Sequence, residues 1–276
     1  MAMSIRTNIA SLNAQRNLYA TQVALDSSLA RLSSGFRITK AGDDAAGLGI
    51  SSKLESQIRS YAQAVRNAND GMSVIQSTEA ALNEQANVLT RLRELAMQSA
   101  SDGVGNSERA YIQKESGALV AEHERISQVA EYNGTKLLNG VAATLDFQVG
   151  IYSTTNDAVT FTTLNATTGV SGLNVSGMSL AAKASALASL ASLDYALSQV
   201  SAARADLGAN GNRLASAVAN IQSFAESLSA ANSRIKDVDV AEETSRMSRS
   251  QILLQAGVSV LAQANQMPQM ALKLLG

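Results

Sequence analysis

One proline, Pro268, occurs in the whole chain, so nothing before it forces a helix to break. Hydrophobic residues make up 46% of the sequence, whereas aromatic residues make up only 4% and tryptophan is absent. A compact globule usually relies on aromatic rings for much of its core, while small aliphatic side chains suit helices that lie close together along their length. The sequence therefore predicts a mainly α protein built from long helices that pair antiparallel into coiled-coil bundles.

Apolar residues at intervals of three and four predict helices over residues 4–32, 50–100, 107–132 and 180–235, and again after residue 236. Within the first of these segments two apolar stripes are out of phase, which indicates a helix that packs on more than one face. Its charges are sparse and its polar residues frequent. Such a helix is marginal in water by itself.

The last segment repeats apolar residues every seven positions, at Val240, Met247, Leu254 and Leu261, with Gln251 and Val258 between them. A sustained interval of seven predicts the seam of a coiled coil. The first segment has a comparable apolar row that begins with Ile5, Ile9 and Leu12. Both ends of the chain are thus amphipathic and weak, and we expect each to complete the other.

The periodicity changes after Asn133–Gly134. Leu145 and Phe147 alternate with polar residues, and Val159 and Phe161 alternate with threonines after a turn-like sequence at residues 155–157. A period of two is typical of half-buried strands, so a β-hairpin is predicted in the middle of the chain.

A glycine-rich stretch separates the first two helical segments. Read alone, it is compatible with a phosphate cradle, a metal site or a joint between helices. A P-loop needs Lys and Ser or Thr after its second glycine, where Leu48 and Gly49 stand here, and no nucleophile with a base accompanies the carboxylates. We therefore favour a joint in which glycines turn the chain and a carboxylate caps the next helix. Its residues are Gly35, Gly42, Asp43, Asp44 and Gly47.

Charge and composition exclude several classes of function. The net charge is −1 without a basic run, which argues against nucleic acid or anionic membrane as a partner. The absence of cysteine excludes disulfides and thiolate zinc sites. We expect neither a Sec-type signal peptide nor a membrane-spanning helix, since no sufficiently long apolar run occurs.

The one histidine, His123, lies in the sequence HERIS, which lacks the second histidine of an HExxH zinc site. We expect it to be a solvated helix residue. No convergent catalytic motif is present, so the sequence predicts no cofactor, no metal and no enzymatic activity.

Several stretches closely resemble bacterial flagellin. Near the N-terminus these are SLNAQRNL, SLARLSSGFRI, AGDDAAGLGIS and RNANDGMSVIQSTEAAL, and EYNGTKLLNG follows them. The C-terminal matches include LGANGNRLASAVANIQ and VLAQANQMPQMALKLL. Larger flagellins carry hypervariable outer domains between these regions, whereas residues 141–179 alone separate them here. The resemblance therefore implies a minimal flagellin.

The resemblance implies a subunit that polymerises into the filament of the bacterial flagellum. Residues 1–45 and 236–276 would form an inner-core domain, and residues 46–140 and 180–235 an outer helical domain bearing the hairpin region 141–179. Other implied partners are an export chaperone, the export apparatus, and the filament cap and hook-junction proteins. The resemblance also implies that the subunit is located outside the cell and is exported without a cleaved Sec signal. The residues expected to pack in the filament core are Ile5, Ile9, Leu12, Val240, Met247, Leu254 and Leu261.

The segment Thr90 to Ala96 resembles the patch that the flagellin-sensing Toll-like receptor of a host recognises. The family pattern assigns receptor contacts to Arg91, Leu95 and Glu115, while Thr90 replaces the usual glutamine.

The alternatives to a flagellin are a hook–filament junction protein, which shares helical ends, or a helical enzyme or receptor fragment.

Overall fold

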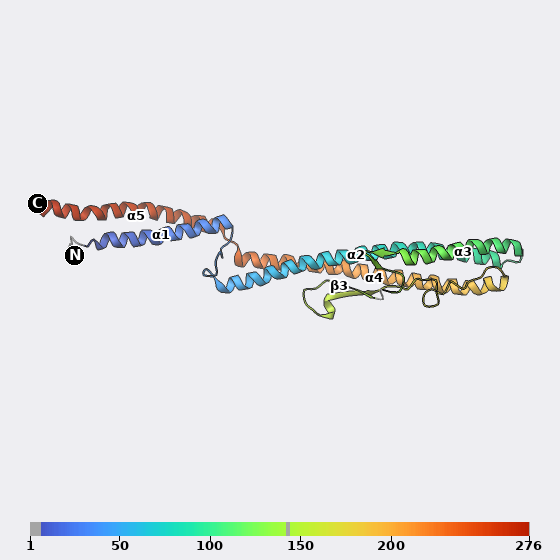
Figure 1. The fold of residues 1–276 in the computed structure, drawn as a ribbon. Coiled ribbons are helices and arrows are strands. Elements are labelled where there is room, and N and C mark those ends of the chain that lie inside the picture. The colour runs from blue at the N-terminus through green and yellow to red at the C-terminus, as the bar shows by residue number, and fades with distance from the viewer. Residues whose placement is uncertain (1–6, 142–143, 276) are drawn as a thin grey trace. The chain divides into compact units, whose positions relative to one another are not determined.

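The computed structural model describes residues 7–141 and 144–275, with side chains up to residue 266. Its helices are α1 (Ile9–Ser34), α2 (Ala45–Ala100), α3 (Asn106–Val129), α4 (Lys183–Lys236) and α5 (Val240–Leu275). Its strands are β1 (Glu131–Tyr132), β2 (Thr135–Lys136), β3 (Thr144–Gln148) and β4 (Ala158–Thr162), and η1 (Thr155–Asp157) precedes the last. The predicted class, mainly α with a small β-hairpin, is confirmed (Figure 1).

The chain divides into two compact units, which are described separately below. The terminal unit holds the chain up to Ile58 and from Glu226 onward, and the central unit holds Arg59–Ala225. Helices α2 and α4 contribute residues to both. In the described chain, no helix combines the length and the apolar character needed to cross a membrane.

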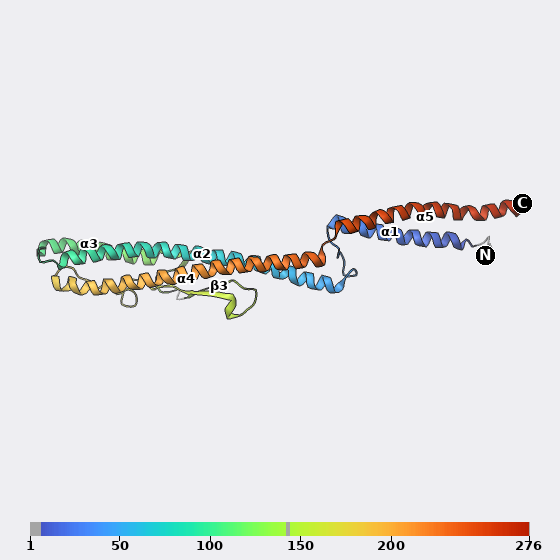
Figure 2. The same cartoon turned by 180° about the vertical axis from the view of Figure 1, so that it is seen from behind.

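The central unit is a bundle in which α3 lies beside α2 and α4 completes the core (Figure 1, Figure 2). Arg93 of α2 pairs with Asp194 of α4, and Glu79 pairs with Arg204, so the two helices run antiparallel. Helix α4 buries a row of large apolar residues at intervals of seven, as expected for a coiled-coil seam. These residues are Leu193, Val200, Leu207, Leu214 and Ile221.

The predicted hairpin forms from β3 and β4, in which Leu145 pairs with Phe161 and Phe147 with Val159. The rings of Phe147 and Phe161 stack with centroids 5.7 Å apart. Phe147 lies against Gly71 of α2, where a Cβ atom would stand 3.0 Å from the ring. Gly71 lies in the interior of α2, and its lack of a side chain lets the hairpin approach closely.

A second, shorter hairpin was missed in the sequence. The third helix was expected to continue to residue 132, but it ends at Val129, and β1 pairs with β2 around Asn133–Gly134. These two residues have φ values of 48° and 79°. Asn-Gly is a strong signal for a two-residue hairpin turn, since both positions require positive φ, and here it outweighs the helical pattern before it.

The close approach at Gly71 gives a first test. Leucine at this position must push against Phe147 and Leu214, so Gly71→Leu is expected to destabilise the protein by about 1–3 kcal/mol. Gly117 of α3 has open space around it, so Gly117→Leu should be neutral or stabilising by up to about 1 kcal/mol. Urea denaturation followed by circular dichroism measures both, and equal effects would contradict the close-packing role of Gly71.

Candidate functional site

In the terminal unit, α1 and α5 lie side by side in both views and run antiparallel (Figure 1, Figure 2). Asn8 donates its side-chain amide to the carbonyl oxygen of Ala264 at 2.8 Å. Ser28, at the other end of α1, donates to the Glu243 carboxylate at 2.6 Å. Polar contacts therefore hold the helix pair at both ends and fix its register.

The seam of this pair alternates large apolar residues with small or polar ones, and on α1 it contains the buried Leu25 and the half-buried Leu18 and Leu32. The less exposed positions of α5 recur at alternating intervals of four and three, as in a coiled coil. At Gly257 the helices come so close that a Cβ atom would stand 3.0 Å from the Leu18 side chain. The α5 seam consists of Glu243, Met247, Ser250, Leu254, Gly257, Leu261 and Ala264.

This seam partly agrees with the predicted heptads. Met247, Leu254 and Leu261 lie on it, but Val240 is 61% exposed and lies outside it. The second row is Ser250, Gly257 and Ala264, one position away from the Gln251 and Val258 that the sequence suggested. The predicted row is one position off because the side chains of Ser250, Gly257 and Ala264 are too small to produce an apolar pattern in the sequence.

Many other large apolar side chains point away from the seam. On α1 they include Ile9 and Leu12, two of the residues predicted to pack in the filament core, whereas Ile5 lies outside the described residues. An ordinary helix pair buries most of its large apolar residues and exposes polar ones, whereas this pair leaves at least as many large apolar residues outside as it places in the seam. The exposed set is Ile9, Leu12, Tyr19, Val23 and Leu29 on α1, with Val240, Ile252, Leu253, Val258 and Val260 on α5.

Two connectors join these helices to α2 and α4, and they pair with one another. Helix α1 ends at Gly35 with φ of 75°, a left-handed conformation that favours glycine. Beyond it, Phe36 and Asp237 form an antiparallel bridge, in which Val238 donates its N–H to the carbonyl oxygen of Gly35 at 3.0 Å. The ammonium group of Lys236 also lies 4.5 Å from the centroid of the Phe36 ring. The joint is thus a pair of connectors held together by backbone hydrogen bonds at a single bridge.

The carboxylates of the joint have structural tasks. Asp44 caps α2 by accepting the N–H of Gly47 at 2.8 Å. Asp43 accepts the N–H groups of Thr39 and Lys40 at 3.0 Å, and these hydrogen bonds, that of Thr39 foremost, lower the pKa of its carboxyl.

The predicted joint glycines fall into two groups. Gly42 lies in the turn before α2, with open space around it. The prediction is wrong for Gly47, which lies inside α2 and is buried against Ile38 and Asp44. A Cβ atom there would stand 2.8 Å from the Ile38 side chain, so close packing rather than turn geometry requires glycine.

A charged cluster lies where the connectors meet the helix pair. The Arg31 guanidinium stands 3.8 Å from the Asp43 carboxylate and 3.9 Å from that of Glu243, which is only 4% exposed. The Arg246 guanidinium also lies 3.9 Å from the Glu243 carboxylate. These four side chains border a cavity of about 200 Å³. In the part of the chain that the structure describes, no three His, Asp or Glu side chains are grouped to hold a metal ion.

Comparison with known proteins agrees with this architecture. The model of the bacterial flagellin N-terminal helical region matches residues 5–143, and that of the C-terminal helical region matches residues 190–275. The chain belongs to the bacterial flagellin family. It is 40% identical to the flagellar filament 33 kDa core protein of Treponema phagedenis and 40% identical to a flagellin of Halalkalibacterium halodurans. Each alignment spans 99% of this chain and the whole of the relative.

Among solved structures, the crystal structure of Bacillus cereus flagellin is 26% identical and matches with a TM-score of 0.49, covering 56% of this chain and 88% of that one.

As a member of the flagellin family, the present chain is a structural subunit that polymerises into the flagellar filament, and it is not an enzyme. The family resemblance inferred from the motifs is therefore confirmed, and the enzyme alternative is excluded.

The structure separates the three residues for which the family pattern implies receptor contact. Arg91 and Glu115 meet on the surface, where the guanidinium donates to the carboxylate at 2.8 Å and also pairs with Glu94 at 3.0 Å. Leu95, by contrast, is 1% exposed in the core of the bundle. A receptor cannot touch Leu95 while the unit is folded, so only Arg91 and Glu115 stay candidates for contact.

The expectation for His123 is wrong, because its side chain is 0% exposed. It lies in the core of the flagellin bundle, and in the described part of the chain neither ring nitrogen has a hydrogen-bond partner. Desolvation lowers the pKa of His123 to about 4, against the opposing influence of the neighbouring Glu124 carboxylate. The sequence around it is polar, and only the packing of α3 on α2 reveals the burial.

This buried histidine predicts a pH dependence of stability. Folding favours neutral His123, so its contribution is constant above the ordinary pKa of 6.5. Between pH 6.5 and about 4 the histidine binds a proton in the unfolded chain but not in the folded one. The free energy of unfolding therefore falls by about 3 kcal/mol in total over this range. Urea unfolding at a series of pH values measures this loss.

His123→Leu is the control, because it removes the titrating group and keeps an apolar side chain in the core. The carboxylates titrate alike in both proteins, so the difference between their stability curves reports on His123. We expect the free energies of unfolding to diverge between pH 6.5 and 4. Curves that stay parallel would contradict the assignment.

Proposed function

We propose that the outward apolar faces of α1 and α5 are the surfaces by which subunits pack in the filament core. The observation that carries this proposal is the exposure of large aliphatic and aromatic residues on both helices of the pair, outside the seam. Monomeric soluble proteins rarely expose large apolar patches, and such patches mark interaction surfaces. Burial against neighbouring copies removes this surface from water, and Ile9, Leu12 and Val240 belong to it.

The geometry of the faces also suits an open polymer. The α1 face carries Tyr19 and Val23 and the α5 face carries Ile252 and Leu253, so the two faces differ in shape and composition. Contact between two different surfaces is heterologous, and it generates an open helix when its rotation does not close. Met247, Leu254 and Leu261 support this packing indirectly, since they hold α5 against α1.

The two structural units support a division of labour. We assign packing in the filament core to the α1–α5 pair and its connectors, which belong to the proposed inner-core segments 1–45 and 236–276. The helical bundle and its hairpins would form the outer part of each subunit, over residues 46–140, 141–179 and 180–235. The paired connectors, with Gly35, Gly42, Asp43 and Asp44, serve as the joint between the α1–α5 pair and the adjoining ends of α2 and α4, within the terminal unit.

Further partners follow from the same weak helix pair. A pair that buries few large side chains opens at little cost, which suits export of an unfolded chain to the outside of the cell by an export apparatus and its chaperone. Filament cap and hook-junction proteins would then meet the same apolar faces at the filament ends. A host Toll-like receptor would contact Arg91 and Glu115, which are half-exposed.

The α5 face can be tested by one substitution. Leu253 is 53% exposed, so Leu253→Asp should change the stability of the free chain by no more than about 0.5 kcal/mol. In a filament the same charge is buried without a partner and costs about 3–5 kcal/mol per subunit. We expect normal circular dichroism of the monomer and no filaments by electron microscopy after seeding.

Gln255→Asp is the matched control, because it adds the same charge at an exposed polar position of α5. Its filaments should grow normally. Leu254→Asp should prevent filament growth too, but through separation of α5 from α1. Normal filaments from Leu253→Asp would refute the proposed packing face.

The weakness of the helix pair predicts where a protease cuts first. In the monomer, α1 and α5 should open locally while the bundle stays closed, since the bundle buries the larger apolar side chains. Brief proteolysis should therefore remove both ends and leave a fragment close to residues 59–225, identified by mass spectrometry. First cuts inside that fragment would contradict the proposed order of stability.

A further inference from the structure

Asn-Gly occurs three times in the chain, at residues 133–134, 139–140 and 210–211. We propose that Asn133 is a site of spontaneous deamidation in the folded protein, and that the other two asparagines are protected. The sequence alone does not distinguish them, because all three have the glycine that makes an asparagine reactive. The distinction comes from their surroundings.

The chemistry requires only the chain and water. The backbone nitrogen of Gly134 attacks the side-chain carbonyl carbon Cγ of Asn133, so a new N–Cγ bond closes a five-membered succinimide ring. The bond from Cγ to Nδ2 breaks, and the amide nitrogen leaves as ammonia with the proton from the Gly134 nitrogen. Water then opens the ring, giving aspartate if it adds at Cγ and isoaspartate if it adds at the main-chain carbonyl carbon.

Asn210 is held in an unreactive geometry. It lies within α4, where the Gly211 nitrogen is part of the helical backbone. The Asn210 side chain donates to the carbonyl oxygen of Asp206 at 3.0 Å and accepts from Arg213 at 3.2 Å. Attack would require unwinding a helix that continues for more than two turns on either side.

Asn139 is hindered by its neighbours. Its side-chain oxygen accepts the N–H of Val141 at 3.1 Å, and this hydrogen bond restricts rotation of the side chain. Gly140 is crowded, since a Cβ atom there would stand 2.7 Å from the Asn165 side chain. Asn139 itself is half-buried.

Asn133 is free of these restraints. It is exposed at the tip of the β1–β2 hairpin, and no atom lies within 4 Å of a Cβ atom built on Gly134. In the described residues its side chain makes no recorded hydrogen bond. The ladder beneath the turn has only the pairs Glu131–Lys136 and Tyr132–Thr135, so the turn opens readily and samples the geometry that attack requires.

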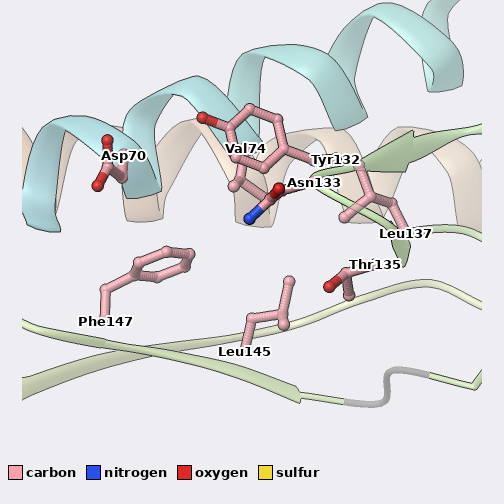
Figure 3. Close-up of a pocket in the computed structure, with 8 residues that line it drawn as sticks. All are labelled: Asp70, Val74, Tyr132, Asn133, Thr135, Leu137, Leu145 and Phe147. Atoms are coloured by element: carbon pink, nitrogen blue, oxygen red, sulfur yellow. The ribbon is translucent and has the colours of Figure 1, made fainter.

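The product would alter a groove of the central unit. Asn133 lies between Asp70 and Val74 of α2 and Leu145 and Phe147 of β3, which border a space of about 670 Å³ (Figure 3). Deamidation adds a carboxylate to a groove that Asp70 also borders, and like charges repel. Isoaspartate also adds a methylene to the main chain of a two-residue turn in which both φ values are positive. Deamidation therefore loosens the β1–β2 hairpin from α2.

Peptide mapping by mass spectrometry tests this assignment on the full chain. The protein is incubated folded at mildly alkaline pH, and the conversion of amide to acid is followed separately in the peptides that contain Asn133, Asn139 and Asn210. We expect Asn133 to react at least roughly tenfold faster than Asn210, because local opening of the turn costs far less than opening of the helix. Asn139 should fall between them.

Two controls make the result decisive. In denaturant the three sites should react at similar rates, which shows that folding creates the difference. Asn133→Gln should abolish the fast ammonia release of the folded protein, since attack on the longer side chain closes a less favourable ring. Equal rates at the three sites of the folded chain, or a faster reaction at Asn139 or Asn210, would overturn the proposal.

Discussion

The α1–α5 pairing depends on a seam in which small and polar side chains alternate with leucine and methionine, and this constraint governs the terminal unit. Ser28 and Glu243 fix the register through a short hydrogen bond, and Gly257 lets Leu18 approach closely. Each choice lowers the apolar area that the pair buries by itself. Several large apolar residues remain on the outside, where the proposed packing against neighbouring subunits would cover them. A seam with leucine also at the small and polar positions would give a more stable monomer with less reason to polymerise.

The connectors transmit this arrangement to the rest of the terminal unit. The Phe36–Asp237 bridge ties the two connectors together through backbone hydrogen bonds, so a movement of one connector displaces the other. Arg31 stands between the carboxylates of Asp43 and Glu243, one on a connector and one on α5. The glycine-rich stretch that first invited comparison with an active site is thus one half of a double joint.

The central unit follows a different principle. Its helices bury leucine and valine in a regular heptad seam, and its hairpins cover α2 where Gly71 leaves room for Phe147. This division explains why the charged surface residues Arg91 and Glu115 stay available while Leu95 does not. It also explains how a lone histidine becomes an internal group whose charge opposes folding, since α3 packs its polar-looking segment inward.

The sequence by itself determined the long helices, the hairpin of β3 and β4 and the family, because helical period, strand alternation and motifs are local properties of the chain. The tertiary structure decided which stripe of each helix faces inward. Val240 looked like a seam residue and is exposed, His123 looked solvated and is buried, and Gly47 looked like a turn and packs against Ile38. Periodicity defines the faces of a helix, but burial of a face depends on the surface opposite it, which residues far away in the sequence supply.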